Sequence, residues 1–119
     1  MVGWTEYKNQ SRERGSLALE LFAVISQPAG SQEAIKDALP EHLAYQAELE
    51  TAGALALAGP LSDLSGEKME GEGLIIYRAA SLGAARKLAE NDPMHLTGAR
   101  RFTIRAWLVN EGILAEKKQ

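Results

Sequence analysis

The order of apolar segments with strand or helix character constrains this chain more than any other feature of its sequence. An apolar run rich in branched residues covers 17–25, and a segment with apolar residues three and four apart follows it. Two short apolar runs, 54–59 and 74–78, flank a polar stretch of turn formers. A second amphipathic segment, which Ser81 can cap, precedes alternating apolar and polar residues over 102–108. The pattern predicts the order strand, helix, strand, strand, helix, strand.

The bounds of the first predicted helix depend on how Pro40 is accommodated. The helix follows a break at Pro28 and Gly30, and Ser31 is expected to cap its first turn. Pro40 lacks the N–H that a helix interior needs, so the sequence predicts a new helix or a kink there. The helical pattern ends at Gly53, a residue type favoured just beyond helix ends.

This order of elements is that of the ferredoxin-like α+β fold, in which a four-stranded antiparallel sheet carries two helices on one face. The other face of such a sheet is bare, so we expect a homodimer built on it, with Trp107 at the contact. The domain is expected to span 17–112. Residues 1–16 are an N-terminal extension that could form a short helix, and 113–119 are a tail whose end, EKKQ, is expected to fray.

Composition narrows the class of protein. The 119 residues suffice for one domain, and 45% hydrophobic with 24% charged residues is typical of soluble proteins. No apolar run is long enough to cross a membrane and no signal peptide is evident, which predicts a cytoplasmic protein. The absence of cysteine excludes disulfides and thiolate chemistry, and we expect no cofactor and no metal. The net charge of −3 argues against nucleic-acid binding, and the strand at 74–78 offers only Tyr77 for stacking on a base.

Several segments together resemble the YCII family of YciI-like proteins, which belongs to the dimeric ferredoxin-like α/β-barrel superfamily. They are EHLAYQAELETAG at 41–53, ALAGPL at 56–61, GLIIYRAASLGAARKLAENDP at 73–93 and, for one subgroup, HLTGARRFTIRAWLVNEG at 95–112. The resemblance covers about residues 17–112. It implies a dimer and a site centred on His42 and Asp92, in a fold class that also contains small enzymes of aromatic-compound breakdown such as muconolactone isomerases.

The two residues implied by the resemblance have chemistry that suits proton transfer. The ordinary pKa of histidine, about 6.5, lets His42 exchange a proton near neutral pH, and a carboxylate on one ring nitrogen would leave the other as a base. The alternative is that His42 only packs beside Tyr45 on its helix. Asp92 likewise has an alternative role as the cap of a short helical turn starting at Pro93, although a cap can also act in catalysis.

The position of the pair raises a geometric difficulty. We expect both helices to run in the same direction, with His42 about ten residues, or about 15 Å, before the end of its helix. Asp92 lies just beyond the end of the other helix. The two side chains then meet only if the segment after Asn91 folds back along the sheet, or if a partner subunit supplies one of them.

Other polar and aromatic residues are candidates for binding a substrate. Arg78, Arg101 and Arg105 could hold a carboxylate or enolate through paired hydrogen bonds, or could be solvated strand ends. Trp107 could line a pocket or pack in the dimer. His95, three residues after Asp92, could bind a metal in principle, but no standard ligand motif is present. Our predicted substrate-binding residues are Arg78, His95, Arg101 and Trp107.

Two functions from different classes are compatible with these features. The first is a small cofactor-independent enzyme of isomerase, lyase or dehydrohalogenase type that transfers a proton on a small organic acid or cyclic substrate, with His42 as acid and base and Asp92 as its orienting partner. The second is a non-catalytic dimeric module that binds a small metabolite. Turnover distinguishes them, because a binding module forms no product.

Overall fold

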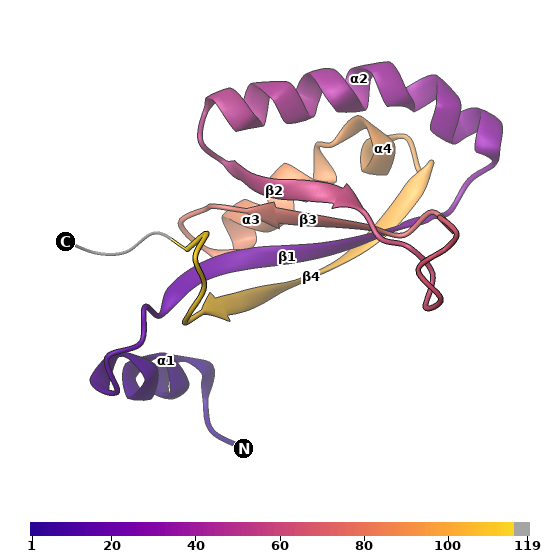
Figure 1. Cartoon of the computed structure of the whole chain (residues 1–119). Coiled ribbons are helices and arrows are strands. Elements are labelled where there is room, and N and C mark those ends of the chain that lie inside the picture. The colour runs from indigo at the N-terminus through magenta and orange to yellow at the C-terminus, as the bar shows by residue number, and fades with distance from the viewer. Residues whose placement is uncertain (116–119) are drawn as a thin grey trace.

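The fold was analysed in a computed structural model that describes residues 1–115. The elements in chain order are α1 (Trp4–Glu13), β1 (Leu19–Pro28), α2 (Gln32–Thr51), β2 (Leu55–Pro60), β3 (Gly73–Tyr77), α3 (Leu82–Glu90), α4 (Pro93–Leu96) and β4 (Arg100–Val109). The strands form one antiparallel sheet in the order β2-β3-β1-β4. Figure 1 shows α2 and α3 lying against this sheet. The predicted order of strands and helices is confirmed, with α1 and the short α4 added to it.

The two faces of the sheet differ in what covers them, because side chains alternate along each strand. The covered face lies beneath α2 and α3, and its core residues Phe22, Val24 and Tyr77 are almost fully buried. The open face carries the opposite set of side chains, including Leu57 and Trp107. These two are 55% and 45% exposed.

Helix α2 is continuous through its proline, so of the two predicted alternatives the new helix at Pro40 is wrong, and the kink stays a prediction. Ser31 caps the helix as predicted, its Oγ accepting a hydrogen bond from Ala34 N at 3.0 Å. Pro40 cannot donate to the carbonyl of Lys36 four residues earlier, but both residues are exposed, so water can take the place of the missing donor. The helix is bowed over the sheet (Figure 1).

The two main helices run in opposite directions, which corrects the prediction that they run the same way. Helix α2 connects two strands of the same direction, β1 and β2, and α3 connects two strands of the other direction, β3 and β4. Each helix must run against the strands it joins, so α3 runs against α2 (Figure 1). The Tyr45 hydroxyl donates to Leu88 O at 2.8 Å and ties them together.

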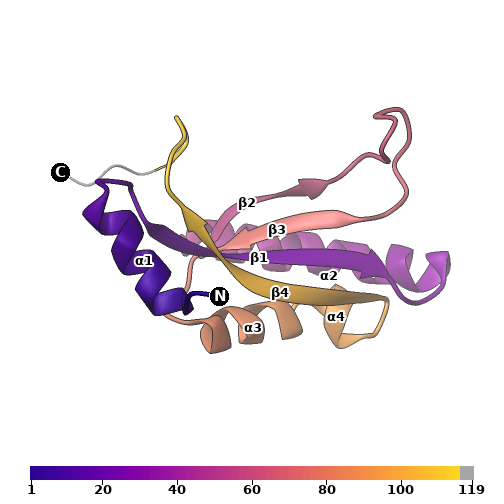
Figure 2. The ribbon, with the colours of Figure 1, turned by 90° about the horizontal axis from the view of Figure 1, so that it is seen from below.

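The N-terminal extension is a helix that is attached to the start of β1. Glu20 accepts a hydrogen bond from the indole of Trp4 and pairs with Lys8 at 3.3 Å. Ser11 on the same helix is fully buried. In Figure 2, α1 lies obliquely beside the end of the sheet at which β1 begins. The expected fraying at 116–119 lies outside the described residues, and no helix within 1–115 has the length and apolar character needed to traverse a bilayer.

Candidate active site

His42 and Asp92 form a hydrogen-bonded pair within one chain. Nδ1 of His42 lies 2.8 Å from Oδ1 and 2.9 Å from Oδ2 of Asp92. The Asp92 side chain is 0% exposed and that of His42 is 16% exposed. Because α3 runs against α2, the end of α3 reaches the middle of α2, where His42 lies. The geometric difficulty is thereby resolved without a contribution from a partner subunit.

The short helix α4 sets the position of the Asp92 carboxylate. Asp92 is its N-cap, and Oδ1 accepts a hydrogen bond from Met94 N at 2.9 Å. Pro93 occupies the first turn, where a missing N–H has no consequence. The predicted capping role is therefore confirmed, and it coexists with the bond to His42. One carboxylate both starts α4 and orients the histidine.

The pairing determines which ring nitrogen of His42 is available for chemistry. An ionised carboxylate can only accept hydrogen bonds, so Nδ1 must carry the proton that joins it to Asp92. In neutral His42 the lone pair is then on Nε2. A carboxylate behind the ring also stabilises the imidazolium that forms when Nε2 takes up a proton. His42 thus has the arrangement expected of a general base.

His42 opens onto a hollow of about 400 Å³ between α2, the sheet and the loop that follows β2. Its wall is mainly apolar, with a few polar groups among the lining residues Ser26, Gln46, Glu72 and Arg100. Hollows of this size and character are typical of sites for small molecules. The apolar part of the wall is formed by Ile35, Leu39, Leu43, Ala58, Pro60, Met69, Leu74, Ile75 and Met94.

A chain of hydrogen bonds connects two residues that line the hollow, Arg100 and Ser26, to His95 behind them. Arg100 Nε donates to Ser26 Oγ at 2.8 Å, Ser26 Oγ lies 2.8 Å from His95 Nε2, and His95 Nδ1 lies 2.7 Å from Ala89 O. The carbonyl can only accept, so His95 carries its proton on Nδ1 and Ser26 donates to Nε2. Burial lowers the pKa of His95, which favours this neutral form. His95 does not line the hollow and instead supports Ser26.

Arg100 and Ser26 were not among the predicted site residues, although the sequence holds a signal for both. Ser26 continues the inward-facing series Phe22, Val24 along β1. Arg100 likewise precedes the inward-facing Phe102 of β4 by two residues. A polar side chain that continues a buried alternation just past the apolar run is expected to lie at the rim of the core.

The other predicted binding residues lie away from His42. Side chains alternate between the two faces along β4, and Arg101 and Trp107 are an odd number of residues from Arg100, so they lie on the open face. Arg78 and Trp107 border a separate hollow of about 650 Å³ there, beside the chain segment 111–115. The structure therefore does not bring Arg78, Arg101 or Trp107 together with the His42–Asp92 pair, and their predicted role in binding stays untested.

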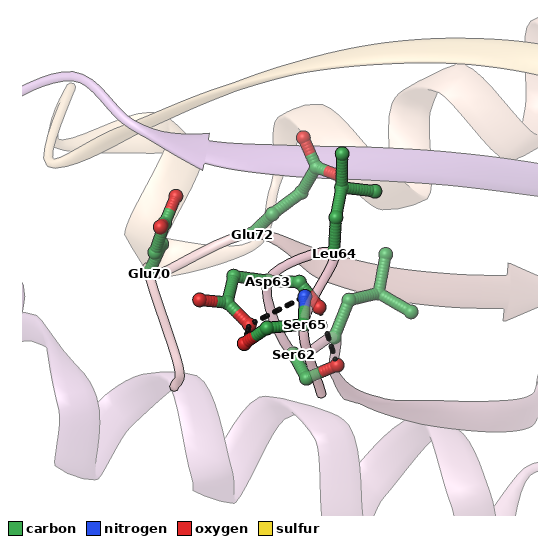
Figure 3. A pocket seen from close by; sticks show the side chains of 7 residues that line it. Ser62, Asp63, Leu64, Ser65, Glu70 and Glu72 are labelled. Atoms are coloured by element: carbon green, nitrogen blue, oxygen red, sulfur yellow. Dashed lines mark hydrogen bonds between the residues drawn. The ribbon is translucent and has the colours of Figure 1, made fainter. Parts of the chain in front are cut away.

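A third hollow lies within the loop between β2 and β3 and has an acidic lining (Figure 3). Asp63 Oδ1 accepts hydrogen bonds from Ser65 N at 3.1 Å and Ser65 Oγ at 2.7 Å, which closes the turn. The hydrogen bond from the Ser65 side chain, supported by those from the backbone amides of Lys68 and Glu67, lowers the pKa of Asp63. Glu70 and Glu72 line the same hollow. Across residues 1–115, no three His, Cys, Asp or Glu side chains are grouped so that they could hold a metal ion.

Comparisons with known proteins agree with this architecture. The sequence profile of the YCII-related domain matches residues 21–108. The chain belongs to the YCII-related family. Its fold is similar to that of 5-chloro-2-hydroxyhydroquinone dehydrochlorinase from Burkholderia phenoliruptrix AC1100, solved in complex with 2,5-dihydroxybenzoquinone, with 22% identity and a TM-score of 0.53 over 72% of this chain and 92% of that one. A comparison with curated proteins finds no match. The resemblance to the YCII family and the ferredoxin-like fold class are thus confirmed.

Proposed function

We propose that this YCII-related protein is a small cofactor-independent enzyme that transfers a proton on a small cyclic or unsaturated organic acid. His42 is the general acid and base, and Asp92 orients it. The observation that carries the proposal is the contact of His42 Nδ1 with both oxygens of a fully buried carboxylate, on a ring that opens onto a hollow of about 400 Å³.

The chemistry begins when the lone pair of His42 Nε2 takes a proton from a substrate carbon next to a carbonyl. The electrons of the broken C–H bond form a carbon–carbon double bond, and the carbonyl becomes an enolate. In an isomerisation, the imidazolium returns the proton to another carbon and restores the carbonyl. In an elimination, the enolate electrons expel a leaving group such as chloride with its bonding pair, and His42 later releases the proton to water.

The name of the structural neighbour supports the elimination branch of this proposal. A dehydrochlorinase removes hydrogen chloride from its substrate, and the first demand of such a reaction is a base beside an acidic proton. The His42–Asp92 pair meets that demand here. We therefore include halogenated cyclic ketones, which carry both a C–H next to a carbonyl and a leaving group, among the candidate substrates, alongside small unsaturated acids and lactones.

Exchange of substrate hydrogen for deuterium tests proton transfer without assuming the final product. A panel of these compounds is incubated with the protein in D₂O and followed by proton NMR. One positioned acid or base contributes about 10²–10⁴ in rate, so His42→Gln should slow exchange at least a hundredfold. Arg86→Gln, at an exposed position of α3, is the matched control and should leave exchange unchanged.

Two outcomes would contradict the proposal. If His42→Gln keeps the exchange rate and pH profile of the wild type, His42 is a packing residue. If a compound raises the melting temperature in a saturable way but is neither exchanged nor converted, the protein is the alternative non-catalytic binding module.

A further inference from the structure

We propose that Arg100 is the anion-binding residue of this site and that the substrate presents to it a planar oxyanion, either a carboxylate or an enolate. The inference rests on the proposed function and names the substrate class. It is based on the hydrogen bonds that Arg100 makes, the charges around it and its place in the hollow that also contains His42.

The guanidinium of Arg100 has hydrogen-bond donors left over. Of its five N–H groups, Nε is used by Ser26 Oγ at 2.8 Å, and Nη2 by Ser26 O at 2.9 Å and by Gly71 O. Neither N–H of Nη1 has a partner among residues 1–115. Two donors on one nitrogen remain for a molecule in the hollow.

The charge of Arg100 is also not paired by any carboxylate within the described part of the chain. Asp92, which acts on Arg100 from beyond ion-pair distance, is engaged by His42 and Met94. Glu72 at the edge of the hollow accepts a hydrogen bond from Gln27 at 2.8 Å. A cation in a mainly apolar wall is costly unless an anion approaches it, and a bound anionic ligand would supply that anion.

Arg100 is held in place before any ligand arrives. Its side chain spans from β4 to the backbone of β1 and to the loop at Gly71. Ser26 is itself fixed by His95, and His95 by Ala89 O. A cation that needs no ordering on binding loses little conformational entropy, which favours both affinity and catalysis.

The position of Arg100 matches the charge that the proposed reaction develops. His42 Nε2 removes the proton, and the negative charge moves to an oxygen of the substrate. Because both residues line one hollow, Arg100 can donate hydrogen bonds to that oxygen while Asp92 stabilises the imidazolium. The substrate is thus a small molecule of about one ring, with its acidic C–H towards α2 and its oxyanion towards β4.

Binding of matched anionic and neutral probes tests this assignment without requiring turnover. Benzoate and benzamide share a shape but differ in charge, and 4-nitrophenolate and 4-nitroaniline do the same for an enolate-type oxygen. We expect the wild type to bind at least one of the anions at least tenfold more tightly than its neutral counterpart, as measured by NMR titration. Arg100→Gln should abolish the preference, and Arg100→Lys should keep part of it, because lysine retains the charge but loses the planar fork.

Arg86→Gln is the control, since it removes a positive charge from an exposed position of α3 outside the hollow and should keep the preference. Equal affinity for both members of each pair, or an anion preference that survives Arg100→Gln, would overturn the assignment. If Arg100→Gln does not fold, the side-chain nitrogen signals of Arg100 in wild-type protein decide: an anion that binds without shifting them also overturns it.

Deuterium exchange that depends on His42 while Arg100→Gln binds normally refutes only this inference. An Arg100-dependent anion preference without exchange refutes only the proposed enzyme.

Discussion

The covered and open faces of the sheet differ in how their side chains are held, even along a single strand. On β4, Arg100 lies on the covered face and is tied to Ser26 and Gly71, whereas its neighbour Arg101 lies on the open face. On the covered face, Asp92 is 0% exposed and is hydrogen-bonded to the His42 ring and to the Met94 amide. On the open face, Trp107 is 45% exposed. Side chains on the covered face are held by hydrogen bonds to the protein, and those on the open face are more exposed.

Among the substitutions that test this contrast, the largest effect after that of His42→Gln is expected from Asp92→Asn. The amide oxygen can still accept from Met94 N, so the amide NH₂ would face His42 and move the ring proton from Nδ1 to Nε2. Nε2 then has no lone pair for proton removal. We expect exchange to fall about ten- to a hundredfold, less than for His42→Gln, with about 1–2 kcal/mol lost in the free energy of unfolding.

The control for this substitution is Asp63→Asn. Asp63 also accepts backbone hydrogen bonds, but it lies in the exposed loop between β2 and β3. It should leave deuterium exchange unchanged. An Asp92→Asn protein with wild-type exchange would show that the orientation of His42 does not depend on the carboxylate.

The open face can be tested by Trp107→Glu. Trp107 lies beside Ala23, Leu74 and Ile76, and we predict that a second copy of the chain covers this apolar surface. Wild-type protein at micromolar concentration should sediment with the mass of two chains, and Trp107→Glu should sediment as one, because burying an unpaired charge is costly. Leu64→Glu, which adds the same charge on an exposed loop, should remain a dimer. A wild-type mass of one chain would refute the prediction.

The smallest expected effect is the pH dependence that His95, on the covered face, adds to the stability of the folded protein. Burial lowers its pKa in the folded protein, so the unfolded chain binds more protons as the pH falls below about 6.5. The stability contributed by neutral His95 is therefore full above that pH and decreases below it, by at most about 1.4 kcal/mol per pH unit. Urea unfolding at pH 7.5 and 5.5 should show a smaller pH effect in His95→Gln than in the wild type, because the variant lacks this one group. An equal pH effect in both proteins would contradict the prediction.

The element order could be predicted because each segment carries its own periodicity and its own stop signals. Ser31, Ser81 and Asp92 were predictable as caps for the same reason, since a cap is a local arrangement. The continuity of α2 through Pro40 could not be predicted locally, because it depends on the exposure of that side of the helix. Local chemistry thus explains most of the fold.

The contact between His42 and Asp92, unlike the caps, could not be predicted from local sequence. It depends on the relative direction of α2 and α3, which follows from strand pairing and not from either helix alone. The erroneous parallel arrangement made the pair seem about 15 Å too far apart along the helix axis. Arg100, by contrast, could have been found by counting in twos back from Phe102, because the alternation of β4 begins at Arg100 itself.

The double role of the Asp92 carboxylate has a spectroscopic consequence. Oδ1 accepts a hydrogen bond from the backbone amide of Met94 and also contacts the imidazole of His42. Any change in the charge of that imidazole alters the electron density on the shared oxygen and hence the strength of the hydrogen bond from the Met94 amide. The chemical shift of the buried Met94 amide proton therefore reports the charge on the His42 ring, with no label placed in the site itself.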